Sequence, residues 1–349
     1  MAQLRSIQFL RGVACCAVVF LHVRFTAPIA GFEESWARLG AAGVDLFFVI
    51  SGLIMATIAK PSPTRFLFDR FWRVMPLWWV VALPWLLFVP FSWETLSATL
   101  TLWPVYSEFT KPALGVGWTL SFEMLFYLTV ALAVRFGWRL PLCLFGFALV
   151  GGLLFDSAIF DWTGNPIIFE FLFGVVVARL PKEERLGLPL IGLAALLFAV
   201  SPLSIYPWEV AINASVAWIR TIFWGFPAAL LVYGSLCAER RFAKVPVVLG
   251  AASYSIYLTH LAVVLALDLY WPIEFALAVG AGFLVWKVVE RPILRAKPQQ
   301  MRGIQLRLAG WSRLLSASTM FTFRRQLDRA ARCRETVDQG ATHSVTRDP

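Results

Sequence analysis

The chain has 349 residues, of which 59% are hydrophobic and only 15% charged, and its formal net charge is +10. Soluble domains carry roughly 45–50% apolar and about 25% charged residues, so this composition excludes an ordinary soluble protein. It predicts an all-α integral membrane protein, and the many aromatic residues are typical of belts at membrane interfaces.

The first predicted membrane span, residues 5–25, carries Arg11 and His22. Eleven residues of helix are about three turns and rise about 16 Å, so the two side chains share one face at different depths. An Arg at the centre of a span costs about 2.5–3.5 kcal/mol on insertion scales, which makes a function the expected reason for its presence. We expect Arg11 to bind a phosphate and His22 to act in proton transfer or nucleophilic catalysis. A structural histidine that bridges two helices is the alternative.

The second predicted span, residues 41–59, carries Asp45 at about the depth of His22. A carboxylate beside an imidazole fixes its orientation and tautomer. We therefore expect Asp45 to orient or polarise His22.

Before the third predicted span, residues 74–92, a loop carries Arg70 and Arg73 together with Arg65 and Lys60. Two arginines three residues apart lie on one helical face, where both guanidinium groups can bind phosphate oxygens. An ordinary cytoplasmic loop rich in positive charge is the alternative.

The later spans contain few polar side chains. Glu123 lies in the fourth span, and Tyr257 and His260 lie in the ninth. We expect these three side chains to line a sugar site or to bridge helices. Glu170 and Glu290 lie near the ends of spans, where neutralisation at a helix end is a fair alternative to function. The fourth to tenth spans are expected at residues 116–134, 138–155, 164–180, 186–203, 214–237, 246–267 and 271–289.

The distribution of positive charge predicts the topology. With a cytoplasmic N-terminus, eighteen Lys and Arg residues up to residue 297 fall on the cytoplasmic side and four on the outer side. This bias supports about ten spans with both termini in the cytoplasm. The first span lacks a cleavage pattern of small residues, so we expect it to be retained.

Two parts of the chain differ in composition. Residues 1–297 are expected to form one membrane domain, and residues 298–349 a basic cytoplasmic tail, amphipathic or disordered. The tail holds nine Arg against four acidic residues, half of the net charge. This distribution favours membrane lipid over nucleic acid as its partner. The five cysteines show no metal-ligand spacing and no disulfide framework, so no metal is expected.

Six motifs occur in an order that resembles one family. They are Leu10-Arg11-Gly12 with His22, the segment from Gly43 to Gly52 (GVDLFFVISG), Arg70-Phe71-Trp72-Arg73, the segment from Trp118 to Glu123 (WTLSFE), the segment from Ser253 to His260 (SYSIYLTH) and Glu290-Arg291-Pro292. Together they resemble the acyltransferase family 3 membrane proteins, which O-acylate cell-surface polysaccharides and related molecules. The resemblance covers roughly residues 4 to 295, and the branch that decorates exopolysaccharide is most similar. Many members have Asp where this chain has Gln8.

The resemblance implies a membrane O-acyltransferase of the bacterial inner membrane. In the family, the arginine–histidine pair and the Arg-x-x-Arg element are associated with catalysis and acyl-CoA use. They correspond to Arg11, His22, Arg70 and Arg73. The acyl group, acetyl by family habit, would pass from cytoplasmic acyl-CoA to a hydroxyl of an exported polysaccharide or lipid-linked sugar. No permanently bound cofactor is expected, and polysaccharide-biosynthesis machinery is a candidate partner.

Two other classes of protein stay open at this point. A transporter or flippase of a lipid-linked sugar would also have ten spans and intramembrane charges, but it gives no reason for the spacing of Arg11 and His22. A structural membrane partner of a polysaccharide synthase is the other alternative. The acceptor, the acyl chain and the choice between base and covalent catalysis by His22 are left open.

Overall fold

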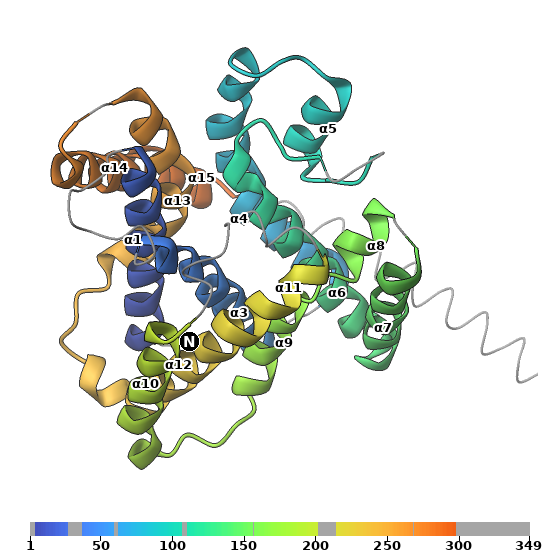
Figure 1. Ribbon diagram of the computed structural model, residues 1–349, viewed down its shortest axis with the longest axis vertical. Coiled ribbons are helices and arrows are strands. Elements are labelled where there is room, and N and C mark those ends of the chain that lie inside the picture. Colours follow the sequence, from blue (N-terminus) through green and yellow to red (C-terminus); the bar gives the residue numbers. More distant parts are fainter. Residues whose placement is uncertain are drawn as a thin grey trace, which may run out of the picture. The chain divides into compact units, whose positions relative to one another are not determined.

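The computed structural model describes residues 4–26, 37–58, 62–106, 110–155, 157–201, 214–267 and 269–297. Over these ranges the chain is helical, as predicted, and no β-sheet forms (Figure 1). The expected basic tail at residues 298–349 and Lys60 lie outside the described residues.

In chain order, the α-helices have the following bounds. They are α1 (Arg5–Thr26), α3 (Ala42–Thr57), α4 (Pro63–Ala82), α5 (Trp93–Thr101), α6 (Trp118–Phe136), α7 (Arg139–Leu154), α8 (Ala158–Thr163), α9 (Ile168–Val177), α10 (Glu184–Ala199), α11 (Ala214–Arg220), α12 (Phe226–Cys237), α13 (Val248–Ala266), α14 (Trp271–Val285) and α15 (Arg291–Arg295). Short π-helical segments join α11 to α12 (Thr221–Gly225) and α14 to α15 (Trp286–Glu290).

Each of the ten predicted spans contains at least part of a helix. Seven helical stretches in the described part of the chain are long and apolar enough to cross a membrane. The three predicted spans outside this set correspond to α4, α7 and α10. Helices α7 and α10 have 16 residues each, and α4 carries Arg65, Arg70 and Arg73 in its first three turns. The structure therefore confirms an all-α, multi-pass membrane architecture.

Helix α4 begins eleven residues before the predicted third span, so the prediction that its arginines lie on a loop is wrong. Ser62 caps the helix, because its hydroxyl accepts a hydrogen bond from the backbone N–H of Arg65 at 3.2 Å. Pro63 follows at the first helical position, where its fixed φ suits a helix start. Arg70 and Arg73 thus have a rigid helical support.

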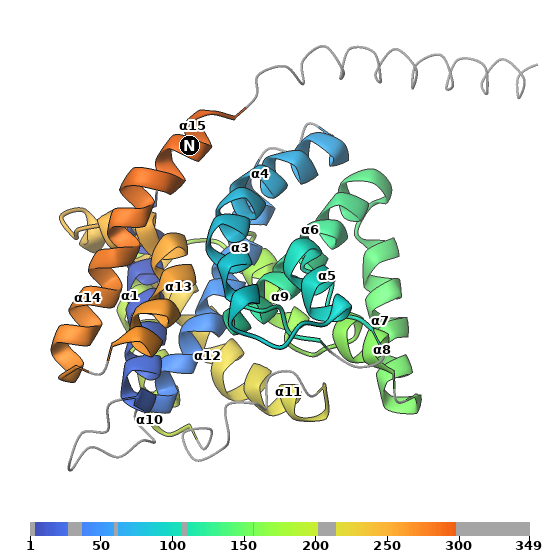
Figure 2. The ribbon, with the colours of Figure 1, turned by 90° about the horizontal axis from the view of Figure 1, so that it is seen from above.

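Helices α1 and α13 lie side by side and run parallel. Cys15 donates from Sγ to the carbonyl of Ser253, and His22 contacts His260. The second contact lies seven residues, or two turns, after the first on both helices. The helices therefore keep the same register over about 10 Å. In both views α14 lies with this pair (Figures 1 and 2).

Helix α3 packs against α9 at very short range. A Cβ atom on Gly52 would lie 1.9 Å from the carbonyl oxygen of Phe171, and one on Gly174 would lie 2.0 Å from that of Val49. Small residues let helix backbones approach closely in a membrane, where packing drives association. Since α3 also contacts α1 and α12, this contact helps to fix the helix that lines the site.

Candidate active site

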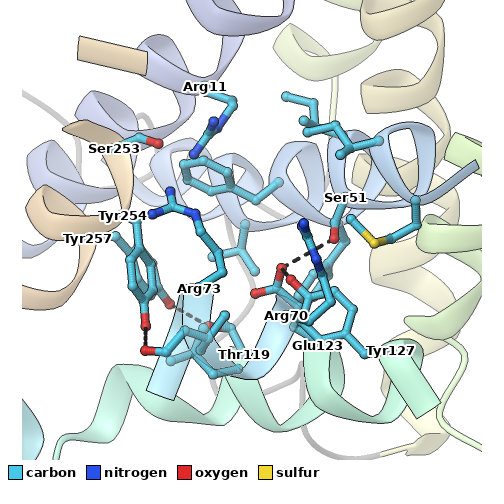
Figure 3. A pocket seen from close by; sticks show the side chains of 18 of the residues that line it. Arg11, Ser51, Arg70, Arg73, Thr119, Glu123, Tyr127, Ser253, Tyr254 and Tyr257 are labelled. Atoms are coloured by element: carbon cyan, nitrogen blue, oxygen red, sulfur yellow. Dashed lines mark hydrogen bonds between the residues drawn. The ribbon is translucent and has the colours of Figure 1, made fainter. Parts of the chain in front are cut away.

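A cavity of about 360 Å³ opens between α1, α3, α4, α6 and α13 (Figure 3). We call it the arginine cavity, because three guanidinium groups line it. Its polar lining residues are Arg11, Ser51, Arg70, Arg73, Thr119, Glu123, Tyr127, Ser253, Tyr254 and Tyr257. Five of the six motifs, from distant parts of the sequence, therefore meet at this cavity.

The three arginines of this cavity differ in their partners. Arg73 forms an ion pair with Glu290, whose side chain is 2% exposed. The other oxygen of Glu290 accepts a hydrogen bond from Ser255 at 2.5 Å. Within the described ranges, neither Arg11 nor Arg70 has a hydrogen bond or ion pair, and the Nε atom of Arg70 is buried. The guanidinium N–H groups of Arg11 and Arg70 can therefore donate hydrogen bonds to an anionic ligand.

Glu123 lies in the wall of the same cavity. Its Oε1 atom accepts hydrogen bonds from Ser51, at 3.3 Å, and from Tyr127. These bonds tie α3 to α6 and fix the carboxylate. The position agrees with the expectation that Glu123 belongs to the site, and its role in binding a substrate stays a prediction.

A second cavity, of about 470 Å³, lies toward the other end of α1 and has His22 in its wall. We call it the histidine cavity. Its other polar lining residues include Lys111, Trp118 and Arg220, and the rest of the wall is mostly aliphatic. Val44 and Tyr257 line both cavities. Arg11 and His22, on one helix, thus face two spaces that share a boundary.

Tyr257 lies at this boundary. Its hydroxyl is 2.9 Å from the hydroxyl of Thr119 and donates to the carbonyl of Val116 at 3.1 Å. The ring is held by groups on α6 and on the short turn before it. A side chain that lines both spaces suits the predicted role of Tyr257 near a substrate.

His22 and His260 form a pair between α1 and α13. Nδ1 of His22 lies 2.9 Å from the carbonyl oxygen of Val18 and 3.3 Å from Nε2 of His260. Nδ1 of His260 lies 2.7 Å from the carbonyl oxygen of Tyr257. His260 is fully buried and lines neither cavity, so this position does not support the expected contact with a substrate.

The structure does not bring Asp45 to His22. Both Asp45 oxygens accept hydrogen bonds from Arg220, at 2.9 and 2.8 Å, and Arg220 also donates to the carbonyl of Ala41. Asp45 is completely buried, as is Glu170, a second carboxylate near the same guanidinium. The expectation that Asp45 orients His22 is therefore wrong, because a buried carboxylate takes the strongest available cation as its partner.

Three residues of this region were not predicted as site residues. Each contacts a predicted residue: Glu290 forms an ion pair with Arg73, Arg220 forms one with Asp45, and Tyr127 donates a hydrogen bond to Glu123. The signal for Glu290 and Arg220 was present, since an ionisable group close to an apolar segment needs a partner of opposite charge. The sequence contains no information on which partner each one takes. Among the described residues, no group of three or more His, Cys, Asp or Glu could hold a metal ion.

The fold is that of a multi-pass membrane protein in which three arginines line one cavity and a histidine lines the next. The chain belongs to acyltransferase family 3, whose model, described as an acyltransferase domain, matches residues 4–289. It is accordingly an acyl-transferring enzyme. No solved structure matches the chain significantly.

Three relatives agree with this assignment. The exopolysaccharide production protein ExoZ of Rhizobium meliloti (strain 1021) is 35% identical over 292 residues, which cover 74% of this chain and 90% of the relative. The putative membrane-bound transacylase BcsY of Komagataeibacter xylinus is 26% identical, over 73% of this chain and 72% of its own length. The acyltransferase MdmB of Streptomyces mycarofaciens is also 26% identical, over 84% and 92%. None of these comparisons supports the transporter or the structural-partner alternative.

Proposed function

We propose that the protein transfers an acetyl group from cytoplasmic acetyl-CoA to a hydroxyl group of an exported polysaccharide or a lipid-linked sugar. The name of the ExoZ relative refers to exopolysaccharide production, which supports a polysaccharide acceptor. The donor is proposed from the arginine cavity, because the phosphates of coenzyme A need cationic hydrogen-bond donors.

One observation carries the proposal: Arg11 and His22 lie on one helix and face two cavities that share Val44 and Tyr257. The phosphates of the donor bind Arg11 and Arg70, and Arg73 adds charge while it holds Glu290. The thioester arm extends past Tyr257 toward His22. The acceptor hydroxyl reaches His22 from the histidine cavity, so the donor never crosses the membrane as a whole.

His22 has one of two chemical roles in this proposal. As a general base it takes the proton of the acceptor hydroxyl while the oxygen attacks the thioester carbon. As a nucleophile it carries the acetyl group briefly before the hydroxyl takes it over. Both roles place the reacting carbonyl beside His22.

The proposed topology has ten spans with both termini in the cytoplasm, in the bacterial inner membrane. The eighteen positive residues on the cytoplasmic side against four on the outer side support it. In this orientation the arginine cavity faces the cytoplasm and the histidine cavity the outside. Each substrate then meets the cavity on its own side.

The test is acetyl transfer in membranes that contain the wild-type protein or the His22→Ala variant, with radiolabelled acetyl-CoA and extracted polysaccharide. We expect label on the polysaccharide with the wild type and none with His22→Ala at equal amounts of inserted protein. His343→Ala, a histidine variant in the basic tail, is the matched control. Substantial transfer by His22→Ala would exclude both roles of His22, and no transfer by the wild type would exclude this donor and acceptor.

A further inference from the structure

The contacts of His22 and His260 define which nitrogen of each imidazole carries the proton. The Tyr257 carbonyl oxygen can only accept a hydrogen bond, so Nδ1 of His260, 2.7 Å away, carries the proton. A neutral His260 then has its lone pair on Nε2. That lone pair lies 3.3 Å from Nδ1 of His22.

The same reasoning applies to His22. Its Nδ1 atom is also 2.9 Å from the carbonyl oxygen of Val18, which again can only accept. A lone pair on Nδ1 would face the carbonyl lone pairs at this distance and be repelled. Nδ1 of His22 therefore carries its proton and shares it between Val18 and His260, as three-centre hydrogen bonds do. The lone pair of neutral His22 is on Nε2.

We propose that His260 is a positioning residue that, together with the Val18 carbonyl, holds His22 in the Nδ1-protonated tautomer, so that Nε2 of His22 is the atom that reacts. This inference rests on the proposed function, because it assigns a reacting atom to the same histidine. His260 would do for His22 what a buried carboxylate does for the histidine of a catalytic triad. Asp45 is not available for this task, since Arg220 occupies both its oxygens.

The chemistry balances with this tautomer. In the direct route the acceptor hydroxyl proton moves to Nε2 of His22 as its oxygen bonds to the thioester carbon. The C–S bond breaks with its electron pair on sulfur, and the proton on Nε2 passes to the thiolate. While His22 is cationic, its Nδ1–H points at the lone pair of His260 and at the Val18 carbonyl, which lowers the free energy of the charge.

Burial separates this role from substrate binding. His260 is fully buried and lines neither cavity, whereas His22 is part of the wall of the histidine cavity. A change at His260 should therefore affect the chemical step and leave donor binding in the arginine cavity intact.

The first test is kinetic. We expect His260→Leu to lower kcat about 100-fold, with the KM for acetyl-CoA within about twofold of the wild type. His260→Gln places an amide oxygen near the former Nε2 position, where it can accept from His22, and we expect it to retain at least about a tenth of the wild-type kcat. Wild-type kcat in His260→Leu would overturn the proposal, as would equal losses of kcat in the Leu and Gln variants at equal amounts of folded protein.

The second test does not depend on activity. The chain has only three histidines, so a His343→Ala background leaves His22 and His260 alone for ¹⁵N-histidine NMR in membranes. We expect both residues in the Nδ1-protonated neutral tautomer, and the Nδ1 resonance of His22 to shift in His260→Leu, where this N–H loses its contact with His260 and keeps the one with the Val18 carbonyl. A wild-type His22 with its proton on Nε2 would overturn the inference. Failure of the proposed donor or acceptor would abolish transfer but leave these spectra unchanged, so the two failures are distinguishable.

Discussion

Arg70 and Arg73 are one helical turn apart on α4 but have different surroundings. Glu290 and the ring of Tyr254, 5.5 Å from the Arg73 guanidinium carbon, hold Arg73 in place. Arg70 has no ion pair in the described part of the chain, and its guanidinium lines the arginine cavity. In the proposed function, these surroundings favour Arg70 as the arginine that binds the donor and Arg73 as the one that holds Glu290.

Arg70→Gln is expected to raise the KM for acyl-CoA about tenfold or more, because a hydrogen bond to a charged group contributes about 1.5–3 kcal/mol. Initial rates at varied donor concentration measure this change. Arg65→Gln is the matched control on the same helix, since Arg65 forms a partly exposed i,i+4 pair with Asp69 at 3.0 Å and lines neither the arginine cavity nor the histidine cavity. An unchanged donor KM in Arg70→Gln would contradict the phosphate-binding role.

At the scale of helices, the ion pair of Asp45 and Arg220 joins α3 to α11 in an environment with almost no solvent. Loss of one partner of a buried pair costs about 3–5 kcal/mol, whereas replacement of both by apolar residues is often neutral. Arg220→Met should destabilise the protein more than Asp45→Leu, because it leaves two buried carboxylates, Asp45 and Glu170, without their cation. Thermal unfolding in detergent measures the order.

The double variant Asp45→Leu/Arg220→Met separates a structural role of Asp45 from a catalytic one. We expect it to be more stable than Arg220→Met, because only Glu170 is then left without its cation. We also expect it to retain measurable acyl transfer, since Asp45 does not contact His22, with any rise in KM for the acceptor due to Arg220 in the wall of the histidine cavity. A double variant that is folded but inactive at saturating substrate would show that this pair takes part in the reaction.

The contact of α3 with α9 gives a second prediction at this scale. Gly52→Ala forces a methyl group against the carbonyl oxygen of Phe171, 1.9 Å away, and overpacking of this kind costs about 1–3 kcal/mol. A lower unfolding midpoint is expected. Gly146→Ala on α7 is the control, because no atom lies within 4 Å of its added Cβ, and it should leave the midpoint unchanged or raise it. Equal midpoints for both variants would argue against the close packing.

Local sequence patterns predicted the positions of the helices better than they predicted which polar residues pair between helices. The apolar segments predicted a helix for every span. The N-cap residue Ser62, followed by Pro63 at the first helical position, could have placed the start of α4 correctly. The burial of Glu290 beside Arg73 joins positions 217 residues apart, and the pair of Asp45 with Arg220 joins positions 175 apart. One sequence has no pattern that selects these partners, because only the packing of the helices brings them together.

For the molecule as a whole, the sequence predicted an arginine and a histidine on one face of a single helix, and the structure has both lining cavities along α1. It did not predict that the space between them is divided at Val44 and Tyr257. The hydrogen bonds of Tyr257 to Thr119 and Val116 depend on α6 and the turn before it. In the proposed function, the thioester arm therefore has to pass beside this side chain.

The central claim is that a donor on one side of the membrane and an acceptor on the other meet at His22. Sealed vesicles of opposite orientation, with the acceptor polysaccharide enclosed and radiolabelled acetyl-CoA outside, test it most directly. We expect vesicles with the cytoplasmic face outward to label the enclosed polysaccharide, vesicles of the other orientation to do so only after permeabilisation, and His22→Ala to label in neither. Equal labelling of the enclosed polysaccharide from both orientations, or labelling only of polysaccharide on the same side as the donor, would contradict the account.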